Sequence, residues 1–497
     1  MREMTVKEIA AIVGGIIEGS SSNVTVTGFS TNSKEGDEHT LFIPVIGERV
    51  DAHDFIKDAY ANGMRAAFWS REEINQDVPD MVYIKVDNTV DALQRLGAWY
   101  KDQFLIPVVG ITGSVGKTTT KEMIAAALET KYNVLKTSGN MNGQIGLPQM
   151  MCRLMPEHDI AVIEMGMSIP GEMEKLTPIA KPETVVMTNI GVSHIGQLKT
   201  QENIRKEKLN IVNAFSKDST LLVNGDDHLL NEIYEEFGKD KSADKENTQS
   251  SVKIEVSDAT NAALELAQVY TFGLKEGCTF YADQIEIVGE QTHFTFHANY
   301  PDAENGMKSI EERVVLSVLG NHNVSNALAA LAVAMKYGIE PCVAKKGLEA
   351  YRPISMRGGI RKVNGITVID DTYNASPDSM KSAIDVLTAI SGVKRRIAVL
   401  ADILELGELS ESCHRQVGEY IATQPVDEVI TIGTEAAAIM EGIKEHNSGI
   451  KVAHYDTREQ AKEALEADLA SGDAIVFKGS RGMKLDQLVN DLFEKEV

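Results

Sequence analysis

The residue types best suited to chemistry in this chain stand between positions 106 and 121, in the sequence IPVVGITGSVGKTTTK. The first residues are apolar and β-branched, which predicts a buried strand, and a helical pattern begins at Thr118. Gly113 and Gly116 allow the backbone angles and the close approach that a bound polyphosphate needs. Lys117 can reach the β- and γ-phosphates of a nucleotide, and the Thr118 hydroxyl can coordinate Mg²⁺. The segment therefore predicts a nucleoside triphosphate site.

This loop departs in one place from the common phosphate-loop pattern. The pattern has a glycine six residues before the lysine, but Ile111 stands there and the neighbouring glycine is Gly110. A glycine-rich turn that binds nothing would be the structural alternative. We favour the phosphate loop because the strand, the GKT triplet and the helix signals occur together.

Two further side chains with metal-binding chemistry follow apolar runs that predict strands. Glu164 ends AVIE, and His194 follows VVMTNIGVS. A carboxylate and an imidazole at neighbouring strand ends suit a divalent cation beside a triphosphate. Each alone has a structural alternative, a solvated carboxylate for Glu164 and a hydrogen-bonded histidine for His194. Lys208 lies in ENIRKEKLNIV, where spacing alone predicts a solvated helix face with an i,i+4 pair between Glu202 and Lys206.

Composition limits the classes of protein to which the chain can belong. Its 497 residues predict about three domains. The formal charge of −24 argues against a nucleic-acid or anionic-membrane binder, because both use basic surfaces. The four cysteines are scattered without a CxxC pair, which predicts reduced thiols rather than a zinc site or disulfides. The sequence has neither the pattern of a signal peptide nor a run of about 18 apolar residues, so we expect a soluble cytoplasmic protein without a membrane span.

The order of apolar and polar segments predicts an α/β fold in three domains. Residues 1–105 carry short strands and helices and end at a turn and a proline. Residues 106–353 show the strand–helix alternation of a mostly parallel sheet covered by helices, followed by antiparallel strands within 268–312. Residues 354–497 form a second parallel unit with polar residues after each strand. The predicted strands are 108–112, 133–136, 160–164, 184–188 and 220–223 in the central domain, and 367–370, 397–401, 428–432 and 474–477 in the last. Residues 235–258 are polar and charged, which predicts a mobile surface insertion that serves only as a linker.

The motifs of the chain resemble, one after another, those of the Mur ligases. They are GITGSVGKTTTKE, TSGNMNGQIGLP, IEMGMSIPGE, TNIGVSHIGQL, LGNHNVSNALAA, DDTYNASPDSM, LADILELGE and FKGSRGMKLDQL, and the resemblance as a whole covers the chain from about residue 30 to residue 483. DDTYNASPDSM and LADILELGE are most similar to the members that add D-alanyl-D-alanine. Asn374, Ala375, Ser376 and Pro377 stand where the diaminopimelate-adding members carry an arginine motif.

The resemblance implies a fold and a reaction. The fold would have a small α/β UDP-binding domain, a central P-loop ATPase domain with a mostly parallel sheet, and a C-terminal Rossmann-like domain. ATP would phosphorylate the terminal carboxylate of a UDP-MurNAc-tripeptide, and the amine of D-alanyl-D-alanine would attack the acyl phosphate. The products would be UDP-MurNAc-pentapeptide, ADP and Pi, made by a monomer in peptidoglycan precursor synthesis. Two alternatives stay open: another amino-acid ligase of the superfamily, and a nucleotide-binding paralogue without catalysis.

The resemblance also implies which residues hold ATP and metal. The ATP phosphates would be held by the loop residues Gly113, Ser114, Val115, Gly116, Lys117, Thr118 and Thr119. One Mg²⁺ would lie on Thr118 and Glu164. A second would lie on His194 and on a carbamylated lysine, which aligns with Lys208 in preference to Lys206. Carbamylation turns a cation into a carboxylate-like metal ligand. Spacing alone placed Lys208 on a solvated helix face, whereas the resemblance implies that it is a metal ligand.

Other contacts of the family fall on polar residues of all three domains. Asn323 and Asn326 match the adenine contacts, with helix capping as the alternative for Asn323. The other nucleotide and domain-closure contacts would be Arg357, Asp371, Tyr373 and Asn374. Contacts to the dipeptide or the reacting phosphate would be Lys478, Ser480 and Arg481. Contacts to the UDP-sugar would be Ser30, Asn32, Ser33, His53, Asp54, Asn140 and Asn142, in a region where Lys34 and Gly143 depart from the family pattern.

Overall fold

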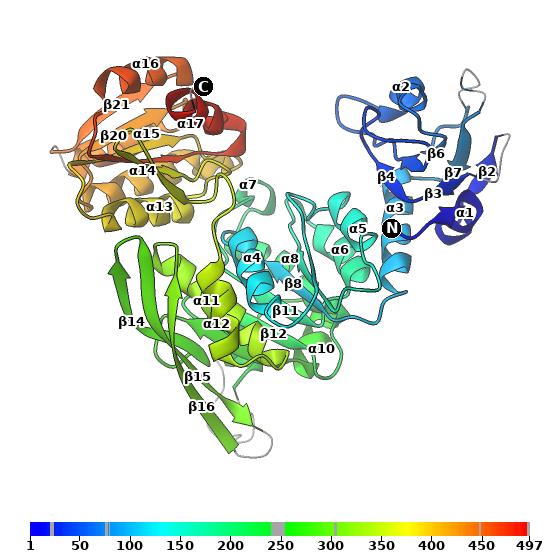
Figure 1. Cartoon of the computed structure of the whole chain (residues 1–497), viewed down its shortest axis with the longest axis horizontal. Helices are drawn as coiled ribbons and strands as arrows, with labels where there is room; N and C mark the ends of the chain where they lie inside the picture. The colour runs from blue at the N-terminus through cyan, green and yellow to red at the C-terminus, as the bar shows by residue number, and fades with distance from the viewer. Residues whose placement is uncertain are drawn as a thin grey trace.

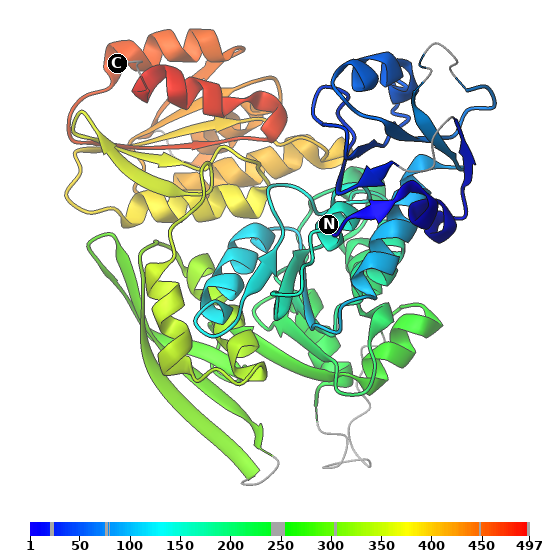
Figure 2. The same cartoon turned by 45° about the vertical axis from the view of Figure 1, so that its right-hand side comes forward.

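The computed structural model describes residues 1–19, 24–74, 78, 80–239, 254–302, 306–446 and 449–494. Within these residues, three large sheets come from successive parts of the chain, beside a small pairing of β1 (Met4–Thr5) with β3 (Thr25–Val26). The N-terminal and C-terminal parts lie on the same side of the central part (Figures 1 and 2). Most of the predicted insertion at 235–258 lies outside the described residues, since 240–253 are not among them. No helix in the described ranges is long and apolar enough to cross a membrane.

The N-terminal part is a five-stranded sheet in the order β2-β7-β6-β5-β4. The strands from β4 to β7 run parallel, and β2 pairs with β7 in the antiparallel sense. The first helix, α1 (Val6–Val13), is capped by Thr5, and the Thr5 hydroxyl and Glu8 carboxylate each accept the other's backbone N–H. The elements are α1 (Val6–Val13), β2 (Ile16–Glu18), β4 (Gly28–Ser30), β5 (Thr40–Phe42), η1 (Ala52–Phe55), α2 (Ile56–Ala61), β6 (Ala66–Trp69), β7 (Val82–Lys85) and α3 (Thr89–Lys101).

The central part is a nine-stranded sheet in the order β16-β15-β14-β13-β12-β11-β8-β10-β9. Alternate residues of its strands face opposite layers. Val108 and Val185 pack with α5, α6 and α8, whereas Val109 and Val186 pack with α4, α11 and α12. The elements are β8 (Val108–Thr112), α4 (Lys117–Leu128), β9 (Val134–Lys136), α5 (Gly146–Met151), β10 (Ile160–Glu164), α6 (Glu172–Ala180), β11 (Thr184–Met187), α7 (Ile195–Leu198), α8 (Gln201–Leu209), η2 (Asn210–Ala214), β12 (Thr220–Asn224), α9 (His228–Phe237), α10 (Asp258–Leu266), β13 (Gln268–Gly273), β14 (Phe280–Val288), β15 (Gln291–Asp302), β16 (Gly306–Leu316), α11 (Asn321–Lys336) and α12 (Pro341–Ala350).

The direction of one strand of this sheet differs from the sequence prediction. Antiparallel strands were expected from residue 268 onward, but β13 runs parallel to β12, with Leu221 opposite Val269. The chain between the two strands crosses over through α9 and α10, and such a crossover returns the next strand in the same direction. Only β14, β15 and β16 form the predicted antiparallel ribbon.

The C-terminal part is a six-stranded sheet in the order β17-β18-β22-β19-β20-β21. It is parallel except for β17, which pairs with β18 in the antiparallel sense. Its elements are β17 (Gly359–Val363), β18 (Ile366–Asp370), α13 (Pro377–Ala389), β19 (Arg395–Ala401), η3 (Gly407–Leu409), α14 (Ser410–Ala422), β20 (Glu428–Ile432), α15 (Ala437–His446), β21 (Lys451–Tyr455), α16 (Arg458–Asp468), β22 (Asp473–Lys478), η4 (Arg481–Met483) and α17 (Leu485–Phe493). The predicted divisions after residues 105 and 353 fall between α3 and β8 and between α12 and β17, and the domain boundaries themselves stay predictions.

Candidate active site

The predicted phosphate loop connects β8 to α4 and has the backbone that such a loop requires. Gly113 has φ +147°, and a Cβ there would lie 1.9 Å from Thr188 Oγ1. Gly116 has φ +85° and precedes α4 without a side-chain cap, so no side chain bonds to the helix N-terminus there. A helix N-terminus without a cap presents free N–H groups and a positive dipole to an anion.

A neighbouring loop after β11 holds the phosphate loop in place. Asn189 accepts two of its backbone hydrogen bonds, from Val115 N to Oδ1 (2.7 Å) and from Ser114 N to the main-chain oxygen (3.0 Å). The Ser114 hydroxyl in turn accepts the N–H of Gly191 at 2.9 Å. Asn189 was not among the predicted residues, because its role arises from contact between two loops that are remote in sequence.

Two lysines point their ammonium groups at the same carbonyl oxygen of the loop. Lys117 Nζ donates to Gly113 O at 2.8 Å, and Lys208 Nζ donates to it at 3.0 Å. Burial lowers the pKa of both, and for Lys208 the charge of Lys117 lowers it further, well below its usual range. Two cations in this position create a strong local attraction for an anion such as a phosphate.

Lys208 is buried, so the helix face predicted from spacing alone is wrong at this position. Its side chain is 1% exposed because α8 packs that face inward against the phosphate loop. Lys206, the second choice for the metal-binding lysine, is instead 46% exposed and lies 3.7 Å from the Glu255 carboxylate.

Oxygen donors lie beside the loop at the end of β10. Thr118 Oγ1 donates to Glu164 Oε2 at 2.9 Å, and Asn142 Nδ2 donates to Glu164 Oε1 at 2.8 Å. Glu164 is 3% exposed, and its backbone N–H is bound by Thr137 Oγ1. Arg357, from the start of the C-terminal part, donates to Thr118 Oγ1 at 3.1 Å. A hydroxyl and a carboxylate are the hard oxygen ligands that Mg²⁺ prefers, and a bound nucleotide would add its own oxygens.

His194 lies in the loop after β11, directly before α7, and its partner comes from the C-terminal part. Its Nδ1 is 2.6 Å from Glu405 Oε2. Burial lowers the pKa of His194, the Glu405 carboxylate opposes this, and the charges of Lys208 and Lys117 lower it again. Within the described residues, no group of three or more histidine, cysteine, aspartate and glutamate side chains is arranged to hold a metal. Glu164 and His194 alone would therefore not complete a metal site, and the predicted metal positions also depend on Thr118 and on groups that a substrate or a modified lysine would supply.

The two asparagines of α11 approach the loop from the other side. Asn326 Oδ1 accepts from Thr120 Oγ1 at 2.9 Å, and Asn323 Nδ2 donates to Leu319 O at 2.8 Å. The capping alternative for Asn323 is wrong, because α11 begins at Asn321 after Gly320 and has no side-chain cap. The adenine assignment of both asparagines stays a prediction.

The predicted residues of the C-terminal part divide into two groups. Arg357 lies over the ring of Tyr373, 3.7 Å from its centroid, and so faces the phosphate loop. Lys478 is held by the Asp371 carboxylate and by Asn374 O at 3.0 Å.

Ser480 and Arg481, like Lys478, bond within the C-terminal part. Ser480 Oγ accepts the N–H of Leu404 at 2.9 Å, and Arg481 pairs with Asp486 at 3.1 Å. The structure therefore does not bring Ser480 and Arg481 into contact with the phosphate loop. Their assignment to the dipeptide stays a prediction.

The predicted UDP-sugar residues lie in loops of the N-terminal part and near Glu164. His53 is 1% exposed, with Nδ1 2.6 Å from Asp51 Oδ1 and Nε2 3.2 Å from Ser70 N. Burial raises the pKa of Asp51, but hydrogen bonds from His53 and Arg71 outweigh it and lower the pKa to about 2. Arg71 also binds Asp54 at 2.7 Å, so His53 and Asp54 belong to one internal polar cluster.

The remaining predicted UDP-sugar residues stabilise turns. Ser30 Oγ donates to Asn32 O at 3.1 Å, and Asn32 Nδ2 donates to Glu35 at 2.8 Å, beside the buried Ser33. Asn142 N bonds to Asn140 O at 2.8 Å, in the turn that brings Asn142 to Glu164.

Comparison with known proteins gives consistent matches along the chain. Three family models match it: "Mur ligase family, catalytic domain" at 25–102, "Mur ligase middle domain" at 111–261, and "Mur ligase, glutamate ligase domain" at 357–481. The chain is 37% identical to the UDP-N-acetylmuramoyl-tripeptide–D-alanyl-D-alanine ligase of Bacillus subtilis (strain 168), over 100% of both chains. It is 30% identical to the ligase of the same name from Escherichia coli (strain K12), over 99% of each.

Solved structures agree with these matches. The structure of MurF from Acinetobacter baumannii is similar with a TM-score of 0.84 and 28% identity, covering 100% of both chains. That of MurF ligase from Thermotoga maritima in complex with ADP has a TM-score of 0.75 and 29% identity, covering 94% of this chain and 97% of that chain.

Proposed function

Because the chain belongs to the Mur ligase family, we propose that it joins D-alanyl-D-alanine to UDP-MurNAc-tripeptide at the expense of ATP. The full-length similarity to ligases of this name supports the substrates, and the three-sheet architecture supports the fold. ATP and nucleotide sugars are cytoplasmic metabolites, and we place the enzyme in that compartment.

The two lysines that bond to Gly113 O carry the assignment of the ATP site. Lys117 is half-buried and Lys208 is buried, and no carboxylate among the described residues is hydrogen-bonded to either ammonium group. A triphosphate in the loop would neutralise Lys117 and accept hydrogen bonds from the N–H groups at the start of α4. Arg357 lies at the same point and would stabilise charge that develops on the transferred phosphoryl group.

We propose that these residues serve an acyl-phosphate reaction. The tripeptide carboxylate attacks the γ-phosphorus of ATP, and ADP leaves. The amine of D-alanyl-D-alanine then attacks the acyl carbon, loses a proton, and displaces phosphate as the amide forms. Thr118, Glu164 and His194 would hold Mg²⁺, which supplies charge neutralisation for the phosphoryl transfer.

Lys208 is also the residue for which we propose carbamylation. Its lowered pKa favours the neutral amine, which can add to CO₂ with loss of one proton. The product is an anion in place of a cation, beside the positively charged Lys117. That change would convert Lys208, a lysine of α8 that is 1% exposed, into a metal ligand.

The mass of the product tests the proposed function most simply. With ATP, UDP-MurNAc-tripeptide and D-alanyl-D-alanine, the purified protein should give ADP and UDP-MurNAc-pentapeptide in equal amounts. Glutamate and single D- or L-amino acids serve as matched amine controls. Ligation of a single amino acid but not of the dipeptide would contradict the proposed substrate, and ADP without any new amide would contradict ligation.

A further inference from the structure

A loop of the C-terminal part docks on the segment that carries His194. The loop follows β19 and spans residues 402–407, and it meets the chain at the start of α7. Glu405 makes two contacts there: Oε2 lies 2.6 Å from His194 Nδ1, and its main-chain oxygen accepts Gly196 N at 3.2 Å. The contact therefore fixes both the side chain and the backbone around His194.

Both sides of this contact have backbones shaped for close approach. His194 and Glu405 have backbone φ angles of +64° and +66°, which residues other than glycine rarely adopt. A Cβ on Gly196 would lie 2.9 Å from Glu405 O, and a Cβ on Gly407 would lie 3.3 Å from Gly196 Cα. Glycine at both positions lets the two segments touch, and the strained angles aim the two side chains at each other.

The docking loop is also held rigidly from behind. The Ser480 hydroxyl accepts Leu404 N at 2.9 Å. His414, which is fully buried, accepts Ile403 N on Nε2 at 2.9 Å while its Nδ1 is 2.7 Å from Ser410 O. These bonds fix the residues on the N-terminal side of Glu405, so its carboxylate is presented by a preorganised loop.

An imidazole has two nitrogens, and a hydrogen bond at one decides which lone pair the other offers. A carboxylate on Nδ1 holds the proton there and leaves the Nε2 lone pair for a metal.

We propose that Glu405 is a positioning residue that fixes His194 with Nε2 available as a ligand, and that completion of the metal site depends on docking of the 402–407 loop. This inference rests on the proposed function, in which His194 is a metal ligand. It also gives Ser480 a role through the loop rather than through the dipeptide.

The test compares Glu405→Ala with Glu408→Ala in the full chain. Glu408 carries the same charge in the neighbouring turn, and its side chain is exposed, so its substitution controls for charge and for folding. A third variant, Glu405→Gln, keeps a carbonyl oxygen that can still accept the Nδ1 proton.

The first measurement is the tautomer of His194, read from long-range ¹H–¹⁵N correlation spectra with a non-hydrolysable ATP analogue and no divalent metal. His194→Asn identifies the signal. We expect an Nδ1–H ring in the wild type, in Glu408→Ala and in Glu405→Gln, and a shift toward Nε2–H in Glu405→Ala. The same tautomer in Glu405→Ala and in the wild type would overturn the inference.

The second measurement is Mn²⁺ binding by electron paramagnetic resonance with the same analogue. Loss of a carboxylate that orients a metal-binding histidine typically weakens the metal about 10- to 100-fold. We expect a loss of this size in Glu405→Ala and little change in the other two variants. Equal affinities in Glu405→Ala and in the wild type would overturn the inference. Neither measurement involves turnover, so a wild type that makes no amide would refute the proposed function separately.

Discussion

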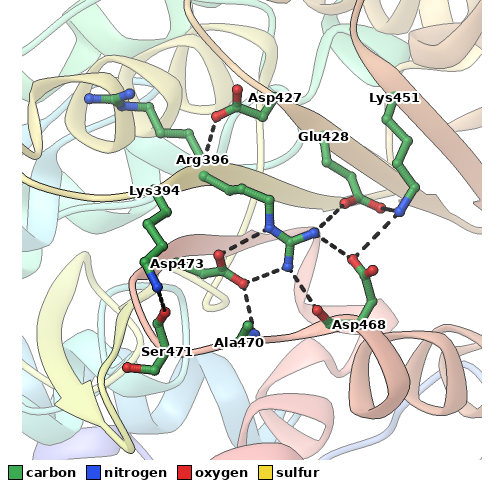
Figure 3. A network of polar contacts seen from close by, with 10 residues as sticks. Lys394, Arg396, Asp427, Glu428, Lys451, Asp468, Ala470, Ser471 and Asp473 are labelled. Carbon is green, nitrogen blue, oxygen red and sulfur yellow. Dashed lines mark hydrogen bonds and ion pairs between the residues drawn. The ribbon is translucent and has the colours of Figure 1, made fainter.

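Two groups of buried or half-buried cations occupy different ends of parallel sheets in this molecule. At the carboxyl end of β8, Lys117 and Lys208 share Gly113 O, and within the part of the chain that the structure describes neither has a hydrogen bond to a carboxylate. At the amino ends of the C-terminal strands, Arg395 is bound by Asp473 at 2.6 Å and by Asp468 at 2.8 Å. Glu428 and Lys451 complete this second group and lie 2.9 Å from each other. Figure 3 shows the carboxylates of Asp468, Asp473 and Glu428 around one guanidinium group.

The two groups shift pKa values in opposite directions. Hydrogen bonds that Arg395 donates to Asp473 and Asp468 raise the pKa of Arg395, and the bond from Arg395 lowers the pKa of Asp468. Burial lowers the pKa of Lys117 and Lys208. A cation that the fold has already paired stabilises the fold, whereas a buried cation left without a carboxylate destabilises it until an anion binds. The difference separates a structural network from a ligand site.

The largest expected effect comes from removing the loop lysine. Lys117→Ala should lower kcat/KM for ADP release by about 10²- to 10³-fold or more, because a phosphate-binding cation is lost. In CO₂-free buffer, where Lys208 is not carbamylated, the melting temperature should stay equal or rise, because repulsion between Lys117 and Lys208 is relieved. Arg395→Ala serves as the matched loss of a paired cation. A melting temperature that falls as far in Lys117→Ala as in Arg395→Ala would contradict the proposed difference.

Lys208→Ala should reduce ligation by a similar factor, because the proposed carbamate ligand disappears. Lys206→Ala, on the exposed face of the same helix, should retain activity. Acetate or formate can substitute for a missing carboxylate-like ligand and should restore part of the Lys208→Ala activity. Turnover of Lys208→Ala at the wild-type rate, measured as product by mass spectrometry, would refute the carbamate.

Arg395→Ala should affect stability and leave chemistry intact. The substitution leaves the Asp473 carboxylate, which is 2% exposed, without its cation. We therefore expect the free energy of unfolding to fall by about 2–4 kcal/mol, toward the lower end because the guanidinium is partly exposed. Urea denaturation followed by circular dichroism measures the loss. Arg361→Ala, which breaks an exposed pair with Glu494, should cost less than about 1 kcal/mol. Equal losses for the two variants would show that the network adds nothing.

The smallest effect is a difference in pH dependence. The folded-state pKa of Lys208 lies below its unfolded value, so between the two values the unfolded chain binds more protons. Stability should therefore rise with pH across this window, up to the unfolded value of about 10.4. The rise should be smaller in Lys208→Ala, as measured by denaturation in CO₂-free buffers between pH 7 and about 10. Parallel pH profiles for the two proteins would contradict the lowered pKa.

Local patterns predicted much of the fold. β8, β10 and β20 have the predicted bounds, and α4 follows the phosphate loop, because a β-branched apolar run and a glycine turn act through neighbours in sequence. β17 and β21 were missed. Both are edge strands with half-exposed residues, so their apolar pattern is weak. β13 was placed in the wrong direction because strand direction depends on the crossover and not on residues within the strand.

The site was predictable where one motif supplies it and unpredictable where two segments meet. Lys117 and Thr118 follow from the loop motif. The inward position of Lys208 follows from the packing of α8, which spacing within the helix does not reveal. Asn189 and Glu405 act across 74 and 211 residues of sequence, and no local pattern marks them. An asparagine or a glutamate after a buried strand, in a chain with a phosphate loop, is the signal that could have suggested both.

The central claim is that the cations around Gly113 O support transfer of a phosphoryl group to a carboxylate. The most direct measurement uses UDP-MurNAc-tripeptide with ¹⁸O in its terminal carboxylate, ATP and D-alanyl-D-alanine. An acyl-phosphate route carries one carboxylate oxygen into the released phosphate, so mass spectrometry should find one ¹⁸O in each Pi and one in the new amide. Phosphate without ¹⁸O, formed together with the amide, would contradict the account.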